Sequence, residues 1–146
     1  MNGVTSSTMS KPFLLDTCAV IWMSQNERFA SGAVDAITAC RTTGVPIYVS
    51  TVTAWEMAML VVRGRVHEKD DAKRWYDDFR RDTKFLEQAV TADIFIQSCR
   101  LPQPVHKDPI DRILIATARE HDLTIVTRDR AILDYGAAGH VRTLAC

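Results

Sequence analysis

The sequence lacks the features that define several large classes of protein. No apolar run approaches the roughly 20 residues needed to cross a bilayer. The polar opening segment has no apolar core of the kind found in a signal peptide. No Gly-x-Gly-x-x-Gly or phosphate-loop motif occurs, which disfavours enzymes that use nucleotide cofactors. We therefore expect a cytoplasmic protein with no membrane segment.

A net charge is also lacking. The 146 residues include 18 Lys and Arg and 18 Asp and Glu, so the formal charge is zero. This balance lacks the basic excess with which many proteins hold nucleic acid. It counts mildly against binding of nucleic acid by charge alone. It does not count against a protein that cuts nucleic acid with the help of a bound cation.

The cysteines form no metal-binding or redox motif. None of Cys18, Cys40, Cys99 and Cys146 belongs to a Cys-x-x-Cys pair, and none has a histidine at zinc-ligand spacing. Cys18 and Cys99 lie in apolar stretches. We therefore expect buried, reduced thiols rather than disulfides or a zinc site.

The composition and length are typical of one soluble globular domain. Hydrophobic residues make up 47% and charged residues 25% of the chain. A chain of this length can bury a sizeable core without disulfides or metals. We expect a flexible tail over 1–11 and a single domain over 12–146.

Short apolar runs alternate with helical patterns along the chain. The runs predict strands at 13–15, 47–49, 85–90, 124–126 and 141–144. The helical patterns lie at 31–44, 53–62, 70–81, 91–99, 109–121 and 128–133, with Ser31 as an expected cap and Gly44 as an expected exit. This alternation predicts a parallel sheet covered by helices on both faces. Such sheets form their sites at the carboxyl ends of the strands, near the switch in strand order.

Four acids occupy places of this kind. Asp16 directly follows the first strand, and Glu56 opens the helix after the second. Asp111 opens the long late helix, and Asp129 follows the strand at 124–126. Because the acids are far apart in sequence, only the fold can bring them together.

Helix capping offers a simpler interpretation of each acid. Thr53 and Glu56 match a capping box, in which the threonine caps the helix and the glutamate reaches back. Asp108 followed by Pro109 is typical of a cap and a first helical residue. Thr127 could cap the helix that carries Asp129.

Charge repulsion distinguishes a shared site from separate caps. Two carboxylates about 5 Å apart, at an effective dielectric constant of about 20, repel by roughly 3 kcal/mol. A helix N-terminus offers a carboxylate only about 0.3–1 kcal/mol. Four acids in one place would therefore need partial protonation or a divalent cation. Ligands that are all oxygen favour Mg²⁺ or Mn²⁺, which can activate water and neutralise phosphate charge for phosphodiester hydrolysis.

Together these motifs resemble the PIN-domain family and, more narrowly, the VapC-type toxins of bacterial toxin–antitoxin pairs. The resemblance extends from about Phe13 to the C-terminus. Each motif is weak alone, but their order and the 18-residue spacing of the last two acids are fairly specific. The segments that carry it are Leu14–Thr17, Thr53–Glu56, Asp108–Ala118 and Leu123–Asp129.

The resemblance implies a three-layer α/β/α fold with a five-stranded parallel sheet. It implies an endoribonuclease that depends on Mg²⁺ or Mn²⁺, a homodimer, and inhibition by a small antitoxin that inserts a segment into the acidic groove. The residues it assigns to catalysis and metal binding are Asp16, Glu56, Asp111 and Asp129. It assigns a supporting hydroxyl to Thr127 and a supporting carboxylate to Asp108.

Several other residues have two interpretations each. Arg112, Arg128, Arg130 and Lys107 could contact RNA phosphates beside the acids, or could be solvated surface charges. Trp55 could stack a base, but we expect it to be a packing residue. We expect His106 to be a loop residue rather than a general acid.

The apolar residues Met57, Leu60, Val61, Trp75, Tyr76 and Phe79 could receive an antitoxin helix, but we favour burial in the domain's own core.

Rival functions are less consistent with the sequence. A phospho-acceptor receiver domain would need paired acids after the first strand and a late lysine, and no lysine follows Lys107. A haloacid-dehalogenase-type phosphatase needs two acids two residues apart, which Asp16-Thr17-Cys18 does not supply. The alternative that stays open is a non-catalytic module of the same fold that binds RNA or protein.

Overall fold

A parallel five-stranded sheet forms the centre of the molecule. The computed structural model describes residues 11–66, 71–103 and 108–146. The sheet has the strand order β3-β2-β1-β4-β5, and its members are β1 (Phe13–Leu15), β2 (Ile47–Ser50), β3 (Leu86–Gln88), β4 (Thr124–Thr127) and β5 (Arg142–Ala145). The chain runs outward from β1 to β3 and then returns to place β4 on the other side of β1. The switch in strand order therefore lies between β1 and β4.

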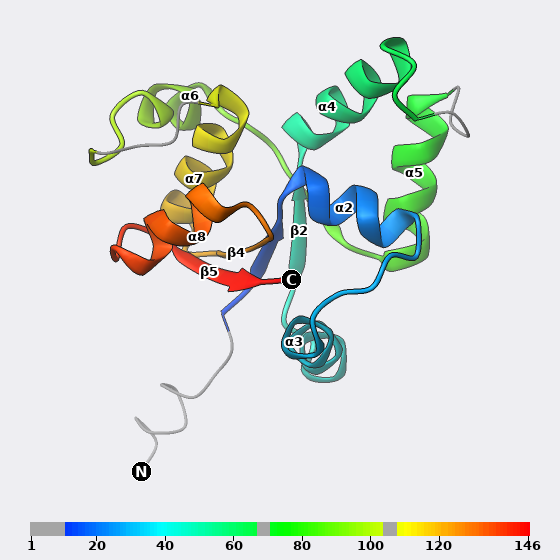
Figure 1. The fold of residues 1–146 in the computed structure, drawn as a ribbon, viewed down its shortest axis with the longest axis horizontal. Coiled ribbons are helices and arrows are strands. Elements are labelled where there is room, and N and C mark those ends of the chain that lie inside the picture. Colours follow the sequence, from blue (N-terminus) through cyan, green and yellow to red (C-terminus); the bar gives the residue numbers. More distant parts are fainter. Residues whose placement is uncertain (1–10, 67–70, 104–107) are drawn as a thin grey trace.

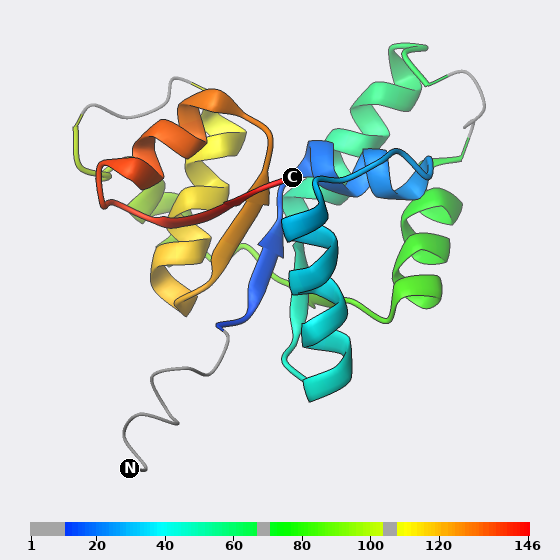
Figure 2. The ribbon, with the colours of Figure 1, turned by 60° about the horizontal axis from the view of Figure 1, so that its bottom comes forward.

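Helices cover both faces of this sheet. Figure 1 shows α6, α7 and α8 on one side of the strands and α2, α3, α4 and α5 on the other, and Figure 2 shows the same division from a second direction. The helices are α2 (Thr17–Ser24), α3 (Ser31–Thr43), α4 (Thr51–Val62), α5 (Ala72–Thr83), α6 (Ala92–Ser98), α7 (Pro109–His121) and α8 (Arg130–Ala137).

The hydrophobic core is divided in the same way. Successive strand residues face opposite sides of a sheet. Leu15 packs with the residues of α2 to α5, whereas Leu14, its neighbour, packs with those of α6 to α8. Val126 and Ile125 of β4 repeat this alternation. These two cores confirm the predicted three-layer α/β/α fold.

The side chains that could have received an antitoxin helix are mostly in the core. Met57 of α4 and the aromatic residues Trp75, Tyr76 and Phe79 of α5 are buried, and Leu60 and Val61 are partly buried against them. The expectation that these residues face the domain's own core is confirmed.

Helix α2 was missing from the sequence-based prediction. Its residues between Cys18 and Met23 are almost all apolar, so they show no helical period of apolar and polar positions. Asp16 begins the helix by accepting a hydrogen bond from the amide of Ala19 at 2.7 Å. The helix is therefore specified by its cap and by burial, and not by amphipathic spacing.

The ends of α3 match the prediction in part. Gly44 ends the helix with a φ of 79°, a left-handed conformation that favours glycine. The residue before the helix is Ala30, which makes no capping side-chain bond, so the predicted cap at Ser31 is wrong.

The cysteines also differ from the prediction. All four are free, but only Cys40 and Cys146 are buried. Cys18 and Cys99 are exposed, because each lies on an outward-facing position of a short apolar helix or its end. The expectation of buried thiols is therefore wrong for these two.

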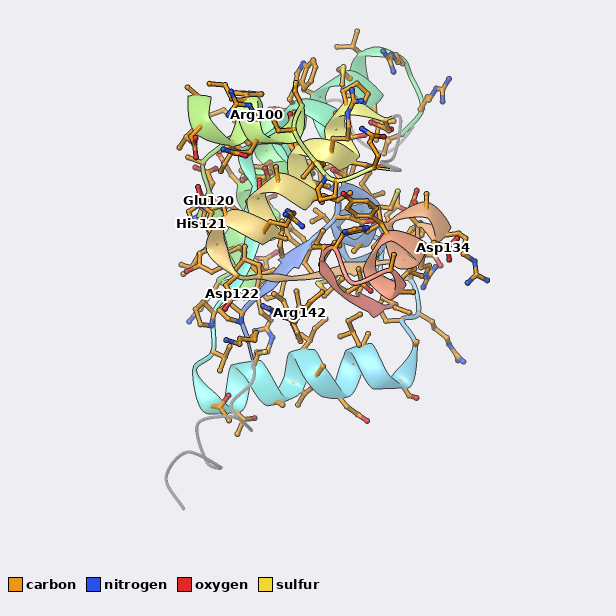
Figure 3. All side chains as sticks on the ribbon, turned by 90° about the vertical axis from the view of Figure 1, so that its left-hand side faces the viewer. Arg100, Glu120, His121, Asp122, Asp134 and Arg142 are labelled. Atoms are coloured by element: carbon orange, nitrogen blue, oxygen red, sulfur yellow. The ribbon has the colours of Figure 1, made fainter. Side chains whose placement is uncertain are left out.

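A group of exposed charges lies at the amino edge of the sheet. Asp122, just after α7, contacts Lys11 at 3.0 Å and Arg142 of β5 at 2.6 Å. In Figure 3, Asp122 and Arg142 lie together beside the end of α7. Lys11 belongs to the predicted tail, whose other residues, 1–10, lie outside the described part.

Within the described ranges, no helix has the length and apolar character needed to span a bilayer.

Candidate active site

The switch point of the sheet brings Asp16 next to the end of β4. Strands β1 and β4 pair in parallel, with Leu15 opposite Val126. The amide of Asp16 donates to the Val126 carbonyl at 3.1 Å. Asp16 therefore follows its strand at the place where Thr127 ends the neighbouring one, as expected for a site in an open parallel sheet.

Asp16 is the most buried of the four acids. The residue is only 3% exposed. One carboxylate oxygen accepts from the Ala19 amide, and the other accepts from the hydroxyl of Thr127. Burial raises the pKa of Asp16, the two hydrogen bonds oppose that rise, and the charge of Asp129 adds to it.

Thr127 links two of the acids. Its hydroxyl donates to Asp16 and accepts from the amide of Asp129 at 2.9 Å. Asp129 itself caps α8 by accepting from the Ile132 amide at 3.0 Å. Thr127 is therefore not the cap of that helix, because the helix begins at Arg130 and the residue before it is Asp129.

Glu56 lies deeper in its helix than the sequence predicted. Helix α4 begins at Thr51, and its cap is Ser50, whose hydroxyl accepts from the Val52 amide at 3.1 Å. The predicted capping box of Thr53 and Glu56 is wrong, because both residues lie inside the helix. The Glu56 carboxylate instead lies in the electrostatic environment of Thr17 of α2 and of Asp16 and Asp108. Burial raises its pKa, Thr17 opposes this, and the charges of Asp108 and Asp16 add to the rise.

Asp111 has the largest shift in pKa among the four acids. It lies in the first turn of α7, whose cap is Asp108, bonded to the amides of Ile110 at 2.9 Å and Asp111 at 3.4 Å. The predicted cap at Asp108 is confirmed. Burial, followed by the charges of Asp108, Asp129, Asp16 and Glu56, raises the pKa of Asp111 to about 8. Acids from four separate segments thus act on one carboxyl group.

The acids share one electrostatic environment without forming a closed cage. Among the described residues, no three His, Cys, Asp or Glu side chains converge tightly enough to hold an ion as they stand. Mg²⁺ does not need such a cage, because it keeps several waters and binds through one or two carboxylates and substrate phosphates. Mg²⁺ prefers oxygen ligands, which these carboxylates supply. A cation among them would also offset the repulsion between Asp111 and the other acids.

Cys18 belongs to the same region, which sequence reasoning missed. Partial desolvation and the charges of Asp16, Glu56, Asp111 and Asp129 raise the pKa of its thiol to about 12. The thiol therefore stays protonated at neutral pH and is unsuited to act as a thiolate nucleophile. The position of Cys18 two residues after Asp16 was the only sign in the sequence that it would lie there.

Arg128 makes internal contacts that the sequence did not indicate. Its guanidinium carbon lies 4.0 Å from the centre of the Trp22 ring. Its Nε donates to the Cys146 carbonyl at 2.9 Å, and a terminal nitrogen donates to the Arg28 carbonyl. Arg128 therefore ties the start of α8 to the loop after α2 and to the end of β5.

Other predicted side chains differ in their accessibility. Arg112 is half-buried in α7, and Arg130 is exposed at the start of α8. Trp55 is 57% exposed, so its interpretation as a packing residue is wrong. His106 and Lys107 lie outside the described residues.

Comparisons with known proteins agree with this architecture. The family model described as PIN domain matches residues 13–138. A curated relative, Ribonuclease VapC22 of Mycobacterium tuberculosis, is 26% identical over 120 residues, which cover 82% of this chain and 88% of the relative.

Solved structures share the fold at low sequence identity. VapBC2 from Rickettsia felis, bound to a DNA fragment from its promoter, contains a chain with a TM-score of 0.66 and 12% identity, over 92% of this chain and 98% of that one. DNA-bound VapBC from Salmonella typhimurium gives a TM-score of 0.59 and 15% identity, over 93% and 98%. Because the family model spans most of the chain, including all four acids, the protein belongs to the PIN-domain family.

Proposed function

We propose that this protein is an endoribonuclease that depends on Mg²⁺ or Mn²⁺, with Asp16, Glu56, Asp111 and Asp129 as its catalytic carboxylates and metal ligands. Nucleases of the family generally use divalent metal ions. The observation that carries the proposal is the raised pKa of Asp111, to which burial contributes most and the charges of Asp108 and the other three acids add. That interaction supports the proposal that four distant segments contribute to one acidic site at the switch point of the sheet.

The chain's own residues prepare this site in different ways. Thr127 and the Ala19 amide hold both oxygens of the Asp16 carboxylate, so its orientation is fixed. Asp129 and Asp111 are only half-buried and lie at helix N-termini, where solvent and substrate reach them. A bound divalent cation would supply a water of lowered pKa and would neutralise charge on the scissile phosphate.

RNA as substrate is supported by the name of the curated relative, a ribonuclease, and by the family resemblance of the motifs. The exposed side chain of Arg130 and the half-buried one of Arg112 are the described cations best placed in sequence to contact phosphates beside the acids. We assign Arg130 and Arg112 to substrate binding. We also assign Arg128 to substrate binding, in addition to its internal contacts with Trp22, Arg28 and Cys146.

A small antitoxin is the partner that we propose. The similar solved structures include VapBC2 from Rickettsia felis, VapBC from Salmonella typhimurium and FitAcB from Neisseria gonorrhoeae. We expect the neighbouring gene to encode a small protein with a basic or Arg-bearing C-terminal segment, which would complement the acidic site. Co-purification from cells that express both genes tests this pairing separately from the nuclease activity.

The homodimer implied by the resemblance stays a prediction, which sedimentation equilibrium of the isolated chain would test.

Cleavage of single-stranded RNA tests the catalytic proposal. The purified chain, free of antitoxin, should cleave RNA with Mg²⁺ or Mn²⁺ and stop when a chelator is added. Asp111→Asn should lower the rate at least about 100-fold, because several kcal/mol of transition-state stabilisation depend on the ion. Asp134→Asn is the matched control, since Asp134 is an exposed acid on α8 that points outward in Figure 3.

The non-catalytic alternative predicts a different result. A chain that binds RNA but cleaves none with either metal, and whose Asp16→Asn variant binds RNA equally well, would be a binding module. That pair of outcomes would overturn the nuclease proposal.

A further inference from the structure

We propose that Trp55 stacks on a base of the RNA substrate, and that an exposed strip of α4 guides the strand from the acids towards two arginines. The inference rests on the proposed function, because it assumes that RNA reaches Glu56. It goes beyond that function by naming a residue that holds a nucleotide beside the cut. The α4 strip consists of Trp55, Met59, Val62 and Arg63, and Arg65 follows it directly.

The strip lies on the side of α4 that faces away from the core. Helix α4 contacts α2 and α5, and its residues Thr53 and Met57, four positions apart, are fully buried. Trp55, Met59 and Val62 form a second series at helical spacing, which begins two residues after the first. Each residue turns a helix by about 100°, so the two series lie on opposite sides. Trp55 is accordingly 57% exposed and Val62 is 87% exposed.

Glu56 joins the strip to the acidic site. Glu56 is three residues before Met59 and seven before Arg63, so it borders the strip along its length. The Glu56 side chain is half-buried, and Asp16 and Asp108 lie close enough to affect its charge. Arg63 follows about 10 Å further along the helix axis. A strand with a phosphate at the acids therefore has neighbouring nucleotides beside Trp55 and Arg63.

The other two tryptophans of the chain have partners within the protein. Trp75 is 5% exposed, and its indole nitrogen donates to the Ser24 hydroxyl at 3.1 Å. Trp22 lies under the Arg128 guanidinium, with 4.0 Å between the carbon and the ring centre. Within the described ranges, Trp55 has no hydrogen bond or ring contact of this kind. Its aromatic surface is therefore available to a ligand, and every base offers a π face to such a ring.

The charges at the end of the strip favour RNA as the occupant. Arg63 and Arg65 are exposed and form no ion pair with another described residue. Aromatic rings combined with cationic groups are the usual means of holding a single strand. A basic antitoxin segment would be attracted to the acids but repelled by these arginines, whereas RNA phosphates are attracted to them.

Affinity for a short single-stranded RNA tests the role of the ring. Fluorescence anisotropy in the presence of a chelator measures binding without cleavage. Trp55→Ala should raise the dissociation constant about five- to 100-fold, the factor expected for one stacked base, and Trp55→Phe should raise it less. Phe95→Ala is the matched control and should bind RNA like the wild type, because Phe95 is 51% exposed on α6 at the other face of the sheet.

A strand without bases shows whether Trp55 contacts a base. An RNA of the same length in which abasic sites replace all nucleotides retains the phosphates but offers nothing to stack. Trp55→Ala should bind this strand as well as the wild type does, although it binds ordinary RNA more weakly. A tryptophan that only supports the local structure would lower the affinity for both strands alike. Calorimetry without RNA should give equal Mn²⁺ affinities for Trp55→Ala and the wild type.

The salt dependence of RNA binding tests the two arginines. The logarithm of the affinity falls linearly with the logarithm of the salt concentration, and each phosphate contact to a single strand contributes about 0.7 to the slope. Arg63→Ser and Arg65→Ser should each lower the slope by about this amount. Trp55→Ala should leave the slope unchanged, because stacking on a base releases no counterions.

The outcomes separate this inference from the proposed function. A wild type that cleaves RNA, beside a folded Trp55→Ala that binds RNA equally well, would overturn the stacking role and leave the nuclease intact. If that variant instead loses self-association or co-purification with the antitoxin, the strip is a protein interface and the inference is wrong. A wild type that binds no RNA would overturn both. Trp55→Leu, which keeps apolar bulk without a ring, replaces the alanine variant if that one does not fold.

Discussion

Thr127 donates its hydroxyl hydrogen to the carboxylate of Asp16, a residue 111 positions earlier in the chain. The bond joins the ends of two neighbouring parallel strands at the switch point of the sheet. It therefore couples the formation of the sheet to the orientation of an acid in the proposed active site.

Thr127→Val should both destabilise the protein and weaken its site. A hydrogen bond to a charged group contributes about 1.5–3 kcal/mol, and Asp16 is too buried to replace it with bulk water. Urea denaturation should show that loss, and Mn²⁺ titration should show weaker binding. Thr127→Ser keeps the hydroxyl and serves as the control. A valine variant as stable as the serine variant would contradict the role assigned to this bond.

The metal-free protein should lose stability as the pH rises towards 8. The pKa of Asp111 is raised from 3.8 in the unfolded chain to about 8 in the folded one, so the folded state binds the extra proton between these values. Stability from this group is therefore greatest at low pH and declines as the pH rises through that window. Asp16 and Glu56, whose pKa values are also raised, act in the same direction.

Melting temperatures in the presence of a chelator measure this dependence. The wild type should melt at a lower temperature at pH 8 than at pH 5.5, and Asp111→Asn should flatten the difference. An identical pH profile in both proteins would show that Asp111 does not titrate in this range.

Divalent cations should stabilise the wild type more than Asp111→Asn. A ligand at 100 times its dissociation constant adds about 2.7 kcal/mol, which corresponds to about 2–4 °C per kcal/mol for a chain near this size. Thermal unfolding with and without Mn²⁺ at pH 7.5 measures both shifts. An equal rise in the two proteins would mean that the ion binds elsewhere, and Asp134→Asn should respond like the wild type.

Arg128→Lys should be destabilising although it retains the charge. The guanidinium stacks on Trp22 and donates to two carbonyl groups, a planar arrangement that an ammonium group does not reproduce. We expect a loss of about 1–2 kcal/mol in the free energy of unfolding. Arg130→Lys, at the exposed neighbouring site, should leave stability unchanged. Equal stability of the two variants would argue against a stabilising role for the contacts of the Arg128 guanidinium.

Gly136→Ala and Gly32→Ala should have opposite effects. A Cβ at Gly136 of α8 would lie 2.6 Å from Oγ1 and 2.7 Å from Cγ2 of Thr143 in β5, so the helix would have to move away from the sheet. Overpacking of this kind costs about 1–3 kcal/mol. A Cβ at Gly32 in α3 meets nothing within 4 Å, and alanine there should stabilise by about 0.4–1 kcal/mol. Chemical denaturation of both variants measures the contrast.

Sequence reasoning succeeded where a local pattern carries the information. The helix over 109–121 was predicted with its bounds because Asp108 caps it, Pro109 begins it and its apolar residues repeat at helical spacing. The strand at β4 and the place of Asp129 followed from a short apolar run and the polar residues after it. The expectation that the acids lie near one edge of the sheet came from the rule that parallel strands end together.

The remaining features depend on contacts between distant segments. Helix α2 has no amphipathic period, so only its burial in the tertiary structure reveals it. The hydroxyl pair of Thr17 and Thr53 and the stacking of Arg128 on Trp22 each join segments that no local pattern relates. The capping box at Thr53 was wrong because Ser50, at the end of β2, offered an earlier cap.

The strand order has a consequence for the timing of synthesis. Asp16 and Glu56 belong to the first half of the chain, whereas Asp111 and Asp129 belong to its last quarter and reach the others only when β4 pairs with β1. A nascent chain on the ribosome therefore carries no complete set of acids until the residues around Asp129 have been added and have left the exit tunnel. The ribosome that makes the protein is therefore exposed to the complete set of acids only after Asp129 has emerged and β4 has paired with β1.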